Sequence, residues 1–200
     1  MTLSEYPKTA TLKDGTEVTL RPMVAADVDA LHAFFAKDVP EEDRLYLRDD
    51  VADRRVVEGW TRNIDYDRVL PILMFRGQRV IADGAIRHNP HGWSRHMAEV
   101  RLVVARAYQG KGAGFVLLKE LVHVAQSKKA QMLLARVFEN SPGGISTFQK
   151  LGFRVEAVLH DFATDIKGRR QNIAVLVRDV DELWTSMEDL LWHGDWRSDS

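Results

Sequence analysis

Short apolar stretches recur between polar, glycine-containing positions along the chain and predict strands interspersed with helices. The expected strands are Glu17–Arg21, Val69–Phe75, Arg79–Arg87, Met97–Ala105, Met132–Phe138, Phe153–Ala163 and Gln171–Arg178. Helical spacing predicts a helix capped by Asp27, one over Asp53–Ile64, one after Gly114, one between Ser141 and Gly152, and one carrying Leu183 to Leu191 before Gly194. The order β, α, α, β, β, β, α, β, α, β, β, α predicts a mixed α/β fold, because so many adjacent strands exclude a purely parallel sheet.

Length and charge narrow the class of protein. The 200 residues contain no repeat or linker, so we expect one domain over residues 1–200. Because 28 Lys and Arg nearly balance 29 Asp and Glu, a nucleic-acid partner is not expected. The absence of cysteine excludes thiol nucleophiles and Cys-based zinc sites. The densest apolar run, Val69–Phe75, is shorter than the roughly 20 residues of a membrane span, and residues 1–15 lack the apolar stretch of a secretory signal. A cytoplasmic protein without a membrane partner is therefore expected.

The most informative segment is Gln109-Gly110-Lys111-Gly112-Ala113-Gly114, which joins a predicted strand to a predicted helix. Without Cβ atoms the backbone can curl until successive N–H groups point at one spot, toward which the positive end of the helix dipole also points. Such a loop receives a phosphate or pyrophosphate. The alternative is an ordinary glycine-rich turn. The segment matches neither the P-loop nor the dinucleotide fingerprint, so a nucleotide-bearing ligand other than ATP or NAD fits better.

The pattern Gln-x-x-Gly-x-Gly after an apolar strand resembles the coenzyme A signature of the GNAT superfamily of N-acetyltransferases. A second region, Glu139-Asn140 followed by Phe148-Gln149-Lys150-Leu151-Gly152-Phe153, is similar to another segment of that family. The resemblance covers nearly the whole chain and implies a central, twisted, mixed but mostly antiparallel sheet flanked by helices. Ala98-Glu99-Val100, Lys13-Asp14-Gly15 and Arg21-Pro22 look most like bacterial protein lysine acetyltransferase domains.

This resemblance implies acetyl-CoA as cosubstrate and assigns residues to it. The loop would hold the pyrophosphate, the strand edge would pair with the pantetheine amides, and the N–H of Val104 would polarise the thioester carbonyl. The implied coenzyme-binding residues are Leu102, Val103, Val104, Gln109, Gly110, Lys111, Gly112, Ala113, Gly114, Asn140 and Phe148. An open V-shaped gap between the strands near Val104 and Leu133 is the structural feature that would support this assignment most.

The resemblance also points to Glu99 as the general base. A lysine ammonium has a pKa of about 10.4, so it must lose a proton before it can attack a thioester, and a carboxylate can take that proton directly or through water. The alternative is a strand glutamate paired with Arg101 or with a neighbouring strand. Many relatives carry a tyrosine acid where this chain has Phe148, which has no proton to give. Ser141, Ser146 or water could substitute for it.

Three further features bear on partners. The acidic segment Asp38–Asp53 borders the acceptor site in this family and would favour a cationic amine, or it is a solvated face. His88, His91 and His96 lie in a loop without metal-ligand spacing, so no metal is expected. The Trp184, Trp192 and Trp196 region is either a homodimer surface or the packing face of a terminal helix.

The function implied is transfer of acetyl from acetyl-CoA to a primary amine by direct attack, without a covalent enzyme intermediate. The preferred acceptor is a protein lysine. The alternatives are a small amine (a polyamine, aminosugar or antibiotic) and a sensor module that binds acyl-CoA without turnover.

Overall fold

The computed structural model describes residues 3–44, 47, 49–141 and 143–193. One sheet runs through this part of the chain, with the strand order β1-β2-β3-β4-β5-β6-β8-β7. The strands are β1 (Lys8–Thr11), β2 (Glu17–Pro22), β3 (Val69–Arg76), β4 (Arg79–His88), β5 (Met97–Val104), β6 (Met132–Phe138), β7 (Arg154–Thr164) and β8 (Arg170–Asp179). Neighbouring strands pair antiparallel except β5 and β6, which are parallel. The predicted mixed α/β fold with a mostly antiparallel sheet is confirmed.

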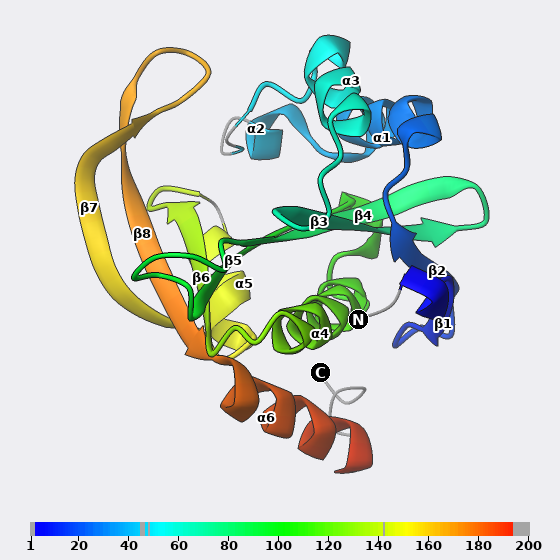
Figure 1. Ribbon diagram of the computed structural model, residues 1–200. Coiled ribbons are helices and arrows are strands. Elements are labelled where there is room, and N and C mark those ends of the chain that lie inside the picture. The colour runs from blue at the N-terminus through cyan, green and yellow to red at the C-terminus, as the bar shows by residue number, and fades with distance from the viewer. Residues whose placement is uncertain (1–2, 45–46, 48, 142, 194–200) are drawn as a thin grey trace.

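Helices lie on both faces of this sheet (Figure 1). They are α1 (Val28–Ala33), α2 (Glu41–Arg44), α3 (Arg54–Arg62), α4 (Ala113–Ser127), α5 (Gly144–Lys150) and α6 (Val180–His193). Helices α1, α2 and α3 lie above β3 and β4 in Figure 1, whereas α4 and α6 lie below. The apolar stripe of α4 is completely buried at Leu117, Leu118 and Leu121, as its helical spacing predicted. None of the helices in the described part of the chain is long and apolar enough to cross a membrane.

The N-terminal region departs from the sequence prediction. Strand β1 precedes the segment expected to be the first strand and pairs antiparallel with β2. Because β1 has four residues, it is too short to show a convincing period. Helix α2 likewise forms inside the acidic segment, for which the sequence pattern predicted no element. A π-helical turn, Phe34–Asp38, follows α1 directly and keeps Phe34 and Phe35 buried.

Asp27 occupies the N-cap position of α1, as predicted, but the side-chain cap expected there is absent. Its carboxylate makes no capping bond to α1. It accepts hydrogen bonds at 2.7 and 2.6 Å from the two terminal nitrogens of Arg21 and one at 2.7 Å from the Val24 N–H. The carboxylate therefore pairs with Arg21 of β2, because a bidentate guanidinium is a stronger partner than the neutral amides of the helix.

The last helix follows the prediction where it is described. Leu183 and Met187 are buried, and Trp184 packs against the core. The side chains of Leu190, Leu191 and Trp192, together with Gly194 and Trp196, lie outside the described residues, so the homodimer surface stays a prediction.

Strands β5 and β6 diverge, and this divergence positions the candidate site. Their parallel register covers Met97–Glu99 on β5 and Met132–Leu134 on β6. Beyond these residues β5 continues to Val104 without pairing to β6. The gap therefore opens on the Val104 side as expected, whereas Leu133 lies within the paired part.

Candidate active site

The divergence of β5 and β6 opens into a cavity of about 640 Å³. Its walls come from β3 to β6, α3, α5 and the loop before α4. Eight of the twelve residues assigned to catalysis or coenzyme binding line it: Glu99, Leu102, Val103, Val104, Gln109, Gly110, Gly114 and, from α5, Phe148. The fold thus brings together segments that are about 50 residues apart in sequence, namely Glu99 and Phe148.

Backbone groups of β5 face this cavity at alternate residues. Ala105 donates to Ile81 on the preceding strand at 2.9 Å. In an antiparallel ladder the bonded residues alternate, so the backbone of Val103 also faces β4. The N–H and C=O groups of Leu102 and Val104 consequently point toward the gap. A splayed strand of this kind can add an extended, amide-bearing ligand as an extra strand.

The glycine-rich loop has the backbone conformation that its sequence indicated. Gly110 and Gly112 adopt φ angles of +73° and +85°, a left-handed region that favours glycine. Gly112 immediately precedes α4, whose first N–H groups have no intrahelical acceptor. The Gln109 side-chain amide donates to the Val104 carbonyl at 3.2 Å and so joins the loop to β5. A Cβ on Gly114 would lie 3.8 Å from the Val104 side chain, so loop and strand are in close contact.

Four of the assigned coenzyme residues do not line the cavity. Lys111 turns toward Asp14, with 3.3 Å between the ammonium and the carboxylate. Gly112 has no side chain, and the side chain of Ala113 is buried, so only the main chain of these two residues could contact a ligand. Asn140 is exposed in the turn after β6. Any contact of Lys111, Gly112 or Ala113 with a ligand would therefore use main-chain groups.

Glu99 is held by an arginine on the diverging strand. Arg136 of β6 donates to both carboxylate oxygens, at 2.9 and 2.8 Å, and both side chains line the cavity. These hydrogen bonds raise the pKa of the Arg136 guanidinium, while partial burial acts in the opposite direction. The ion pair expected for an ordinary strand glutamate is thus present, with Arg136 as the partner in place of Arg101. The pair orients the carboxylate inside the cavity.

A second ion pair on the same face was not found by sequence reasoning. Asp83 of β4 is completely buried, and Arg101 of β5 donates to its Oδ2 at 2.7 Å. The guanidinium also lies 4.8 Å from the ring centroid of Trp60 on α3. Burial raises the pKa of the Asp83 carboxyl, and the charge of Arg101 opposes that shift. The only signal in the sequence is an acidic residue within an otherwise apolar strand.

The acidic segment reaches the cavity at two residues that the structure describes, Asp43 and Asp49. Asp38 pairs with Arg79, and Asp53 caps α3 through the Arg55 N–H. The segment is therefore divided between a cavity rim and structural contacts. Arg48 lies outside the described residues.

Phe148 packs edge-on against Phe153, with 5.1 Å between ring centroids. It forms an apolar wall of the cavity. Of the two hydroxyls considered as replacements for the missing acid, Ser141 lines the cavity. Ser146 donates to the Gly143 carbonyl at 3.1 Å.

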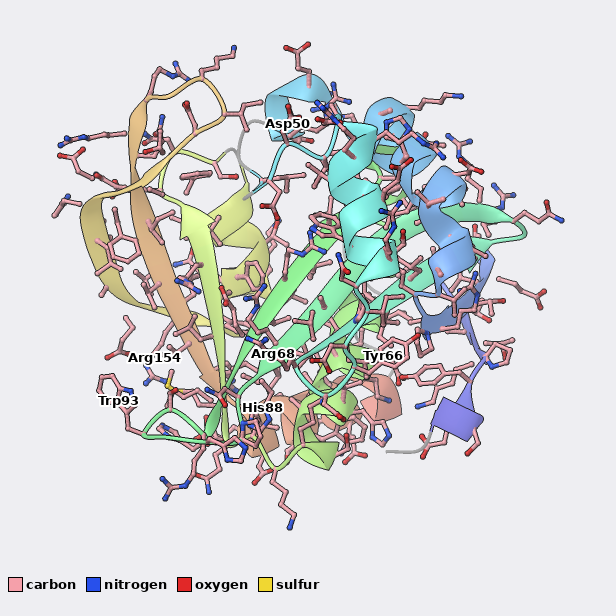
Figure 2. The ribbon with its side chains drawn as sticks, turned by 45° about the horizontal axis from the view of Figure 1, so that its top comes forward. Asp50, Tyr66, Arg68, His88, Trp93 and Arg154 are labelled. Carbon is pink, nitrogen blue, oxygen red and sulfur yellow. The ribbon has the colours of Figure 1, made fainter. Side chains whose placement is uncertain are left out.

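His88 of the β4–β5 region contacts the protein backbone. The ring of His88 lies 2.9 Å from the Arg95 carbonyl. Figure 2 shows His88 near the end of β4 and Trp93 in the following loop, pointing away from the sheet. Within the described ranges no three His, Asp or Glu side chains gather as metal ligands would.

Comparison with known proteins agrees with this geometry. The model of the "Acetyltransferase (GNAT) family" matches residues 29–153. "Putative phosphinothricin acetyltransferase YwnH" of Bacillus subtilis is 30% identical over 83 residues, which are 42% of this chain and 50% of the relative, so the match spans about half the length of that relative. The GNAT domain of S. lividans PAT superposes with a TM-score of 0.72 at 21% identity, covering 88% of this chain and 98% of that domain. Mycobacterium smegmatis RimJ in complex with CoA-disulfide gives a TM-score of 0.76 at 18% identity over 94% of both chains. The predicted GNAT resemblance is confirmed: this chain belongs to the GNAT acetyltransferase family.

Proposed function

We propose that this protein is an N-acetyltransferase that transfers acetyl from acetyl-CoA to a primary amine by direct attack. The observation that carries the proposal is the divergence of β5 from β6 next to the left-handed glycine loop. It supplies free strand amides and a helix N-terminus on one side of a cavity that also contains Glu99.

The coenzyme would bind through main-chain groups. The N–H groups of the loop Gln109–Gly114, together with the positive end of the α4 dipole, suit a pyrophosphate. The N–H groups of Leu102 and Val104 and the C=O of Leu102 suit the amides of pantetheine, since the C=O of Val104 already accepts from Gln109. This arrangement explains why Lys111 can turn its side chain to Asp14 without loss to the site.

The reaction requires proton removal, attack and departure of the thiolate. Glu99 takes a proton from the acceptor ammonium, directly or through water, while Arg136 fixes the orientation of its carboxylate. The amine nitrogen then forms a bond to the thioester carbon, and the Val104 N–H stabilises the oxyanion. The carbon–sulfur bond breaks as the carbonyl re-forms. A thiol pKa of about 8.5 makes the thiolate a tolerable leaving group without a tyrosine acid. The nitrogen loses its second proton as the amide forms, and Ser141 or water can pass that proton to the departing thiolate.

A protein lysine is the acceptor that the family resemblance favours. A small amine is the second candidate, because α3 and α5 border the cavity and because one relative is named for a small substrate, phosphinothricin. A sensor that binds acyl-CoA without turnover is the remaining alternative, suggested by the phenyl ring of Phe148 in place of a phenol.

Thiol release tests the proposal. The chain has no cysteine, so a thiol reagent reports free CoA without background from the protein. Acetyl-CoA with a lysine peptide, spermine or a small amino acid should give acceptor-dependent release. Coenzyme binding without any release would support the sensor and contradict the enzyme.

Glu99→Gln tests the base. We expect kcat to fall by at least about 100-fold with an unchanged KM for acetyl-CoA, because only proton removal is lost. Glu156→Gln is the matched control, since Glu156 is exposed on β7 and pairs with Arg154. An unchanged rate in Glu99→Gln would end its assignment as base.

A further inference from the structure

Two carboxylate–guanidinium pairs lie on the sheet face of the cavity, and in both the carboxylate is the more deeply buried partner. The side chains of Asp83 and Arg101 are 1% and 34% exposed. Those of Glu99 and Arg136 are 14% and 38% exposed. The two guanidinium groups are therefore the more accessible members of these pairs, and Asp43, Asp49 and Asp65 line the cavity away from β4, β5 and β6.

Arg101 has the better defined position of the two arginines. Asp83 accepts from one terminal nitrogen at 2.7 Å, and the indole of Trp60 lies against the guanidinium at 4.8 Å. A guanidinium carries five N–H donors in a rigid planar fork. The hydrogen bond to Asp83 uses one of these donors, and the contacts with Asp83 and Trp60 fix the plane in which the others lie. A fixed, partly desolvated guanidinium of this kind is suited to a carboxylate or another oxyanion.

The position of Arg101 relative to Glu99 sets the size of the ligand. The two residues are two apart on β5, so they lie on the same face about 7 Å apart along the strand. Arg87 lies directly across from Glu99 on β4 and adds a further positive charge to the same cavity. If the amine of an acceptor lies at Glu99, an anionic group a few ångströms from that amine in the same molecule can reach Arg101.

We propose that Arg101, held by Asp83 and Trp60, determines acceptor specificity by binding an anionic group of the acceptor. The acceptor would then be a small zwitterion, an amino compound with a carboxylate or similar oxyanion. It belongs to the small-amine candidates, so Arg101 argues against the protein lysine that the family resemblance favours and against a polyamine. This inference rests on the proposed acetyltransferase function. Arg101 binds the acceptor before and during the reaction alike, so its loss should raise the acceptor KM far more than it lowers kcat.

The test uses ω-amino carboxylates from glycine to 5-aminopentanoate, each compared with the alkylamine of the same length. Spermine and a lysine peptide are the competing acceptors. For the wild type we expect kcat/KM to be at least tenfold higher for the best carboxylate than for its matched alkylamine. In Arg101→Met this ratio should fall to within about twofold, with the KM for acetyl-CoA unchanged. Arg79→Met is the control, since Arg79 is an exposed arginine at the start of β4 that pairs with Asp38 and does not line the cavity; it should keep the wild-type ratio.

Two additions keep the outcome interpretable. Removal of Arg101 leaves a buried carboxylate without its partner, so the double variant Asp83→Asn/Arg101→Met tests specificity in a neutral background. Calorimetric binding of N-acetyl-4-aminobutyrate and N-butylacetamide in the presence of CoA needs no turnover, and the wild type should bind the former at least tenfold more tightly.

Loss of thiol release with every amine would refute the proposed function, and the calorimetric comparison would still decide the role of Arg101. A wild-type preference for alkylamine, spermine or lysine peptide would overturn the inference. So would a carboxylate preference that survives in Arg101→Met and in the double variant.

Discussion

Replacing Gly84 by alanine tests how closely α4 packs on the sheet that carries the site. Gly84 lies in the middle of β4, opposite Leu102. An added Cβ would lie 2.8 Å from a methyl carbon of Leu121 and 3.1 and 3.2 Å from two side-chain carbons of Leu117. Both leucines are completely buried, so they can move only by displacing other core side chains or α4 itself.

The size of the effect follows from two opposing terms. Overpacking of a dense core costs about 1–3 kcal/mol. Loss of glycine's freedom in the unfolded chain offsets about 0.4–1 kcal/mol of that cost. The 2.8 Å contact places the cost in the upper part of its range, at about 2–3 kcal/mol. We therefore expect a net destabilisation of about 1–2.5 kcal/mol, which corresponds to a fall in Tm of about 2–10 °C for a domain of this length.

Urea and thermal unfolding of three variants would measure this. Gly59→Ala is the matched control: Gly59 lies inside α3 with open space around it, so alanine there should stabilise by about 0.5–1 kcal/mol. Leu121→Ala alone should cost about 2–5 kcal/mol, and adding Gly84→Ala to it should cost little more, since the closest contact is gone. A Gly84→Ala variant as stable as the wild type, or strictly additive costs in the double variant, would refute the packing argument.

Two further predictions concern the loop and the distal hairpin. Gly112→Ala should weaken CoA binding by about tenfold in calorimetry, because a left-handed φ costs a residue with a Cβ about 1–2 kcal/mol. Gly168→Ala is the control: Gly168 has a similar φ of +78° but lies in the β7–β8 turn, so CoA affinity should be unchanged. The Arg169 N–H is the largest cause that lowers the pKa of Asp165 to about 2, below the unfolded value of about 3.9. The Asp165 carboxylate therefore protects the Arg169 amide from hydrogen exchange fully above about pH 4, and this protection is lost as the pH falls toward 2. Asp165→Ala should accordingly speed exchange of that amide at pH 6 but hardly at pH 2. An equal effect at both pH values would contradict this.

The sequence predicted what local chemistry determines. The left-handed conformation at Gly110 and Gly112, the buried stripe of α4 and the strand over Met97–Val104 all follow from residue type and period. These are the features in which neighbouring residues alone decide the conformation.

Features set by long-range contacts escaped sequence reasoning. Arg136 is 37 residues from Glu99, and the two meet because of the β5–β6 register, which no periodicity encodes. Arg101 and Asp83 are 18 residues apart and share a sheet face for the same reason. A short strand such as β1 forms because β2 offers it an edge, so its own four residues carry little signal.

Amide NMR during a titration with coenzyme A tests the central claim most directly, because the claim concerns individual N–H groups. Saturable shifts should appear at Gly110 and at the start of α4, and at Leu102 and Val104 on β5, while Val103, bonded toward β4, should move less. Spectra in which these amides stay unchanged at millimolar coenzyme, or in which saturable shifts map elsewhere on the sheet, would contradict the account.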